Sequence, residues 1–162
     1  MSIRKQVGEN VADMQVYLNK MNSTAYKVKL GNLLDVQKGC VKGIYDFAVN
    51  GGAVSTINLL DENGEEVVLP DNAIITNVLV DIVTAMTSTG GTGTIALNSE
   101  GAGDLLAAVD ADTLSGIAAG IPVGTAASAV KLTAERTLSV AIATAALTAG
   151  KFVAIVEYTV SV

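Results

Sequence analysis

Histidine and tryptophan are both missing from this chain of 162 residues, and cysteine occurs once, as Cys40. Histidine is the commonest general base, the commonest metal ligand and the usual partner of a serine or cysteine nucleophile, so its absence removes most hydrolase chemistry. One cysteine forms no intrachain disulfide, and without histidine it builds no ordinary zinc site. We therefore expect no enzyme activity and no cofactor, and a buried or half-buried apolar position for Cys40.

Large aromatic side chains are scarce as well, since they make up 4% of a sequence that is 50% hydrophobic. A core must therefore be built from Val, Ile, Leu and Ala, and small and β-branched side chains favour a sheet. The longest uncharged stretches, residues 82–99 and 113–130, are too rich in Gly, Thr and Ser for membrane spans. No apolar run follows the N-terminal basic residues, so we predict synthesis in the cytoplasm.

Charge divides the chain into a basic leader and an acidic body. Residues 1–42 contain seven of the ten basic residues and three acidic ones, a net charge of +4, whereas residues 43–162 have a net charge of −10. An acidic body argues against nucleic acid as a ligand, because phosphate binding needs clustered Lys and Arg. The basic residues of the leader are too dispersed to form a strong phosphate-binding patch.

The leader contains the spacing of a short amphipathic helix. Asn10 is a favourable N-cap, and an apolar stripe follows at intervals of three and four residues. A helix of about eleven residues is marginal in water, so it needs a surface to lie on, either the chain's own body or another subunit. We predict an N-terminal arm over residues 1–40, whose candidate interface with another subunit consists of Arg4, Lys5, Val7, Val11, Met14, Leu18, Lys20 and Met21.

From Val41 onward the apolar period changes to two, which is typical of strands. We predict strands within residues 41–49, 55–59, 67–69, 74–84, 94–98, 137–142 and 152–160. Turns are expected at 50–52, 61–64 and 149–151, a loop at 89–93 and a long connection at 115–125, while 104–109 fits a helical turn or a strand equally well. Such short strands predict an all-β fold, a jelly-roll-like β-sandwich over residues 41–162.

Two of these strands are more apolar than a monomer with one solvated face requires. In residues 74–84 we expect Ile74, Val78, Val80 and Ile82 to share one face, and residues 152–155 are apolar on both faces. Surplus apolar surface of this kind indicates a subunit interface.

Several short motifs suggest a ligand or a reaction but have a simpler structural interpretation. The segment 61–66 is rich in oxygen ligands but lacks the spacing of an EF-hand, so a hairpin turn is favoured over a calcium site. Asp110 and Asp112 would have to converge in a cleft to act as an acid and base, and a solvated loop is favoured. The Gly91-Thr92-Gly93 and Gly101-Ala102-Gly103 runs complete no phosphate-binding motif.

Four stretches carry a resemblance to a known group of proteins. They are YDFAVNGGAV at 45–54, LP and AIIT within 69–76, EGAGDLLA at 100–107 and LTAGK at 147–151. In this order they resemble small structural proteins of tailed phages, including capsid decoration, or cement, proteins. The resemblance covers most of residues 41–162 and none of residues 1–40. It implies a jelly-roll or related β-sandwich that sits as a trimer on the outer surface of the virion.

Together these observations predict a homotrimeric cement protein that binds the major capsid protein of a phage head, with neither nucleic acid nor membrane as a partner. One alternative is a head-fibre or receptor-binding module that recognises host glycan. Such a module needs aromatic platforms, for which the tyrosine candidates are Tyr17, Tyr26, Tyr45 and Tyr158. A virion-associated hydrolase is a second alternative, and it would require a carboxylate pair in a cleft.

Overall fold

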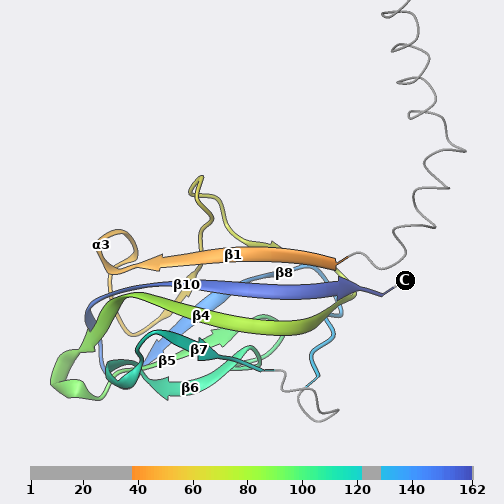
Figure 1. Ribbon diagram of the computed structural model, residues 1–162. Coiled ribbons are helices and arrows are strands. Elements are labelled where there is room, and N and C mark those ends of the chain that lie inside the picture. Colours follow the sequence, from red (N-terminus) through yellow and green to blue (C-terminus); the bar gives the residue numbers. More distant parts are fainter. Residues whose placement is uncertain (1–37, 122–128, 162) are drawn as a thin grey trace, which may run out of the picture. The chain divides into compact units, whose positions relative to one another are not determined.

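The computed structural model describes residues 38–121 and 129–161, and its largest sheet runs along one side of the body (Figure 1). This first sheet has the order β1 (Lys38–Asp46), β10 (Leu147–Val160), β4 (Ala73–Ser88) and β7 (Ile117–Ala119). All three neighbouring pairs are antiparallel. The two longest strands, β4 and β10, therefore lie at its centre.

A second antiparallel sheet packs behind the first and completes a sandwich. Its order is β2 (Thr56–Asn58), β9 (Ser139–Ala143), β5 (Thr94–Asn98) and β6 (Leu106–Asp110). The strands β3 (Val68–Leu69) and β8 (Arg136–Thr137) form a separate two-stranded ladder. Short helical turns occur at α3 (Phe47–Asn50), η1 (Thr89–Gly91) and η2 (Ala111–Thr113). The predicted all-β sandwich is confirmed for the described residues.

The core between the sheets is mainly aliphatic, as the composition predicts. Tyr45 on β1 and Phe152 on β10 are fully buried in it, and their rings stack with centroids 5.3 Å apart. The Tyr45 hydroxyl donates a hydrogen bond to the Gly51 carbonyl oxygen at 2.7 Å. Burial, with a smaller contribution from the charge of Asp46, raises the pKa of Tyr45 to about 12. Tyr45 is therefore a core residue.

The prediction that alternation continues past Tyr45 to residue 49 was wrong. Residues 47–50 form the turn α3, because the Asp46 carboxylate accepts a hydrogen bond from the Ala48 N–H at 3.0 Å and caps it. Val49 is consequently 73% exposed and does not share a face with Tyr45. The turn predicted at 50–52 therefore lies earlier in the chain, at α3, and Gly51 ends it with a positive φ of 71° that favours glycine.

Irregularities in the central strand pair account for two further corrections. We predicted that Ile74 shares the inward face with Val78, but Thr76 has no partner on β10 and shifts the alternation by one residue. Ile75 is therefore buried on the same face as Val78, and Ile74 is only half-buried. Residues 149–151 do not form a turn but belong to β10, where the register shifts around Gly150, whose φ is 132°. An extra residue in one strand changes the face of every residue beyond it.

Two segments that lacked a clear pattern contain strands. The ambiguous segment 104–109 leads into β6, which pairs with β5. The segment predicted as a long connection contains β7, whose three residues pair with β4, while residues 122–125 lie outside the described residues. The predicted loop at 89–93 begins with the turn η1.

Candidate interaction surface

The first sheet has a face that points away from the core, and strand register defines it. Val80, Ala154 and Val156 point inward and are fully buried, so the residues between them point outward. Two rows of directly opposed residues cross all four strands on that side. We call them the outer face: Lys42, Ile155, Leu79 and Ala119 in one row, and Ile44, Val153, Asp81 and Ile117 in the next.

The centre of the outer face is apolar. Ile44, Leu79, Val153 and Ile155 are half-buried by their neighbours, and Ile117 on β7 is 69% exposed. An apolar patch rimmed by charged residues marks interaction surfaces more often than it marks inert ones. The sequence-based prediction that the central strands carry apolar residues on both faces is confirmed.

The charged groups of the outer face lie on opposite sides of this centre. Lys42 belongs to the edge strand β1, and Asp81 belongs to β4, with β10 between them. Both side chains are exposed. Within these two rows, the positive charge lies on the β1 side and the negative charge on the β4 side, with the apolar residues of β10 between them. Beyond the β1 edge, Leu60 bridges to Ile44, and Asp61 and Glu62 line a hollow together with Ile44 and Lys151.

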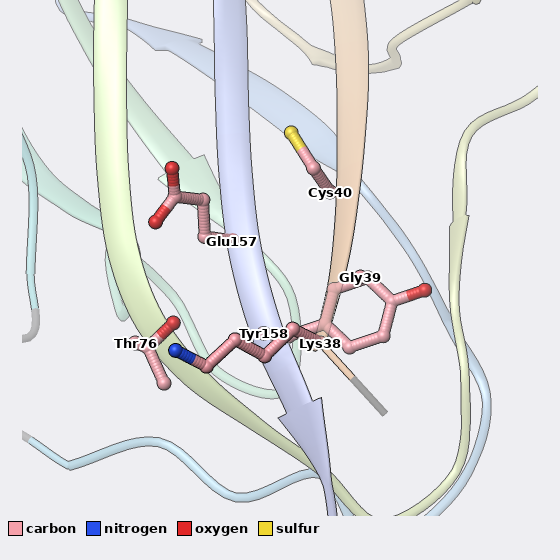
Figure 2. A pocket seen from close by; sticks show the side chains of 6 residues that line it. All are labelled: Lys38, Gly39, Cys40, Thr76, Glu157 and Tyr158. Carbon is pink, nitrogen blue, oxygen red and sulfur yellow. The ribbon is translucent and has the colours of Figure 1, made fainter. Parts of the chain in front are cut away.

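A shallow hollow of about 450 Å³ lies at the N-terminal end of β1 (Figure 2). It is lined by Lys38, Gly39, Cys40, Thr76, Glu157 and Tyr158. The Tyr158 ring covers Gly39, where a Cβ would collide with it. Cys40 lies directly opposite Glu157 and is exposed, so the prediction of a buried or half-buried position was wrong. Cys40 points outward because its neighbours on β1, Gly39 and Val41, are the residues that face the core.

The segment 61–66 forms the predicted turn. The Asp61 carboxylate accepts hydrogen bonds from the backbone N–H groups of Asn63 at 2.8 Å and Glu65 at 3.0 Å. These and the Asn63 side-chain amide hold the pKa of Asp61 below its usual value. The carboxylate therefore acts as a turn-forming acceptor. Among residues 38–121 and 129–161, no group of three acidic or thiol side chains could hold a metal ion.

The two acidic residues considered as a catalytic pair have local structural roles. Asp110 caps η2 by accepting a hydrogen bond from the Asp112 N–H at 3.0 Å. Asp112 accepts hydrogen bonds from the Ser88 hydroxyl and from the Ser88 N–H, the latter at 3.0 Å, and so ties η2 to the end of β4. The prediction of a loop instead of an acid and base pair agrees with these contacts.

The glycine runs and the tyrosine candidates also have structural explanations. In the run Gly101-Ala102-Gly103, the Gly101 N–H donates a hydrogen bond to the Asp104 carboxylate at 2.9 Å. This N–H group therefore stabilises the loop itself. Tyr45 is buried in the core, whereas Tyr158 is half-buried against Gly39 and lines the hollow at the N-terminal end of β1. Tyr17 and Tyr26 lie outside the described residues.

The leader residues predicted as the interface all precede residue 38 and lie outside the described residues. They are Arg4, Lys5, Val7, Val11, Met14, Leu18, Lys20 and Met21. Sequence reasoning did not assign Lys42, Ile44, Asp81 or Ile117 to an interface. The available signal was the apolar content of both strand faces, but the strand order needed to assemble the outer face was not available from the sequence.

Within the part of the chain that the structure describes, no helix has the length and hydropathy needed to cross a bilayer.

No protein-family model matches this sequence, and no curated protein matches it. Solved structures do share its fold, each over 77% of this chain. A chain in the acid-stable capsid of Helicobacter pylori bacteriophage KHP30 is 15% identical, with a TM-score of 0.55 and 89% of that chain covered. One in the cyanophage Pam1 capsid is 19% identical, with a TM-score of 0.54 and 86% covered. One in the capsid of Ralstonia phage GP4 is 19% identical, with a TM-score of 0.50 and 84% covered. The similarity shows a shared fold.

Proposed function

We propose that this protein is a structural component of a phage virion, a homotrimeric decoration or cement protein on the outer surface of the head. The observation that carries the proposal is the shared fold with chains from three phage capsid structures, which extends over most of both partners. The resemblance of residues 41–162 to small phage structural proteins supports the same conclusion.

The chemistry of the body is consistent with a binding role. Its conspicuous carboxylates, Asp61, Asp104, Asp110 and Asp112, each accept hydrogen bonds that shape a turn or join two elements. The sequence contains no histidine to act with them as a base or ligand. The most distinctive surface is instead the outer face, which has the composition of a contact between proteins.

The proposed mechanism is stabilisation by mass action. A protein that binds the assembled shell and not its separated subunits stabilises the shell by RT ln(1 + [L]/Kd) at each site. Many sites on one head multiply this free energy. The leader is proposed to supply the contact with the major capsid protein, through the stripe of Val11, Met14, Leu18 and Met21 and the charges of Arg4, Lys5 and Lys20.

The test is decoration of purified heads by the full-length chain, measured by cosedimentation, together with antibody labelling of virions. The substitution Leu18→Asp should reduce binding by at least about a hundredfold, because a large apolar side chain contributes about 1.5–3 kcal/mol when buried and a charge in its place adds a desolvation penalty. Neutralising Arg4 and Lys5 should weaken binding less and reduce its dependence on salt.

Val16→Asp is the matched control, since Val16 lies on the opposite side of the predicted helix. It should leave decoration near the level of the unmodified chain. If Leu18→Asp still decorates heads at full occupancy, the leader is not the docking segment. If labelling places the chain on fibres and it binds host glycan, the decoration proposal is wrong and the receptor-binding alternative replaces it.

A further inference from the structure

We propose that the outer face of the first sheet is the self-association surface of this protein, buried against a neighbouring copy of the same chain. Lys42 of one copy then pairs with Asp81 of the next. The inference deepens the homotrimer part of the proposed function by assigning its contact surface. It rests on three features of the described residues: an apolar centre, charges of opposite sign on the two sides, and the strand order that separates them.

The apolar centre is the first feature. Val153 and Ile155 lie on β10, with Ile44 beside them on β1 and Leu79 on β4. These side chains are already half-buried, so ordering them against a partner costs less entropy than ordering fully exposed long side chains. Ile117 extends the apolar surface to β7 with 69% of its area exposed. Burial of this surface is the favourable contribution to association.

Polar residues of the same outward-facing side lie in the rows that border this apolar centre at either end. In the next row towards the N-terminal end of β1, Cys40, Glu157 and Asn77 lie opposite one another across β1, β10 and β4. In the row at the other end, Asp46 forms an ion pair with Lys151 at 2.9 Å. An apolar centre with a polar rim is the usual anatomy of a specific protein interface.

The charge arrangement identifies the occupant as another copy. A rotation axis that runs parallel to β10 in front of the face brings the β1 side of one copy to the β4 and β7 side of the next. Lys42 lies on the first of these sides and Asp81 on the second, in adjacent rows about 7 Å apart along the strands. The flexible four-carbon stem of lysine spans such an offset. Lys42 and Asp81 are therefore complementary across such a contact.

When the same rotation is repeated until the ring closes, every copy contacts the next one in the same way. The apolar part of each outer face is then covered. In the proposed trimer, the three β10 strands surround the axis, with Val153 and Ile155 nearest to it. Each of the three contacts joins the positive side of one sheet to the negative side of the next. In this trimer the outer face is covered by other copies of the chain, and no different protein is needed to cover it.

Charge reversal in the full chain tests the proposal, with the association constant measured by analytical ultracentrifugation at low salt and without capsids. Lys42→Glu alone and Asp81→Lys alone should each weaken association by at least about tenfold, because each places like charges opposite one another. The double variant Lys42→Glu with Asp81→Lys restores opposite charges and should recover association to within about threefold of the unmodified chain.

The apolar contribution is tested with a matched pair of variants. Ile117→Asp lies on the outer face, and Val54→Asp changes a valine that is 57% exposed in the segment between α3 and β2. Both positions accept a polar side chain without opening the core. Ile117→Asp should weaken association by at least about tenfold, and Val54→Asp should leave it unchanged.

The inference is overturned if the unmodified chain is monomeric at tens of micromolar, or if both single reversals associate as the unmodified chain does. Its failure can be told apart from failure of the proposed function, because association is measured without heads. A chain that decorates heads as a monomer would keep the decoration role but remove the homotrimer and this inference. If the double variant recovers association but the chain never binds heads, this inference stands and the decoration role is wrong.

Discussion

Glu100 accepts four hydrogen bonds from two residues far from it in the sequence. Its carboxylate accepts two hydrogen bonds from the Arg136 guanidinium, at 2.9 and 3.1 Å, and others from the hydroxyl and N–H groups of Thr133. These contacts join the loop after β5 to the start of β8 and to the segment just before it. The Arg136 and Thr133 hydrogen bonds lower the pKa of Glu100 to about 2. No pattern in the sequence predicts a pair 36 residues apart.

Removal of the Glu100 charge should therefore destabilise the protein in a pH-dependent way. Because the folded pKa of about 2 lies below the ordinary value of 4.5, ionised Glu100 contributes stability that is complete above about pH 4.5. That contribution is lost as the pH falls from 4.5 towards 2. The difference in melting temperature between the unmodified chain and Glu100→Gln should be largest near neutral pH and vanish near pH 2.

The neighbouring exposed Glu135 supplies the control for this titration. Glu135→Gln removes the same charge from a side chain that makes no ion pair with Arg136 among the described residues. Its melting temperature should follow that of the unmodified chain at every pH. A Glu100→Gln difference that stays constant down to pH 2 would mean that the carboxylate contributes by packing and not by charge.

At the scale of single elements, the sequence predicted strands well where each residue has one partner across the ladder. The alternation from Phe152 to Tyr158 was predicted correctly, because no register shift interrupts residues 152–157. It failed at Thr76 and Gly150, where the partner strand and not the local sequence determines the irregularity. It also failed after Asp46, where a cap formed by one side chain competes with the continuation of a strand.

A glycine that joins two elements provides a test at this scale. Gly52 is buried between α3 and β2, and its carbonyl oxygen accepts a hydrogen bond from the Leu147 N–H at 2.8 Å. A Cβ at this position would collide with the Leu147 carbonyl oxygen at the start of β10, which the sheet holds in place. Gly52→Ala should lower the free energy of unfolding by about 1–3 kcal/mol in urea titrations, as overpacking does.

Gly101→Ala is the matched control, because a Cβ there meets only the Asp104 Cβ, at 4.0 Å, in an exposed loop. Its unfolding free energy should change by less than about 0.5 kcal/mol. Equal effects of the two substitutions would show that the β10 start moves to accommodate a side chain at Gly52, and that this junction is not rigid.

For the whole molecule, the sequence predicted the sandwich and the surplus of apolar surface but not the location of that surplus. The strand pattern shows that β4 and β10 are apolar on both faces. Only the order β1-β10-β4-β7 places Lys42 and Asp81 on opposite sides of one face. Strand order depends on contacts between residues far apart in the chain, which local periodicity does not encode.

The described body has a closed core of its own, and this gives the last prediction. Its buried apolar residues extend from Tyr45 to Val156 and come from both sheets. If the leader docks on the capsid, a chain without residues 1–24 should unfold cooperatively, with a melting temperature within about 3 °C of the full chain at equal protein concentration, a difference of about 1 kcal/mol. The same truncated chain should lose head decoration, because a short helix contributes binding free energy only against a partner surface. Unfolding or aggregation of the truncated chain would mean instead that the stripe of Val11, Met14, Leu18 and Met21 completes the core of the body.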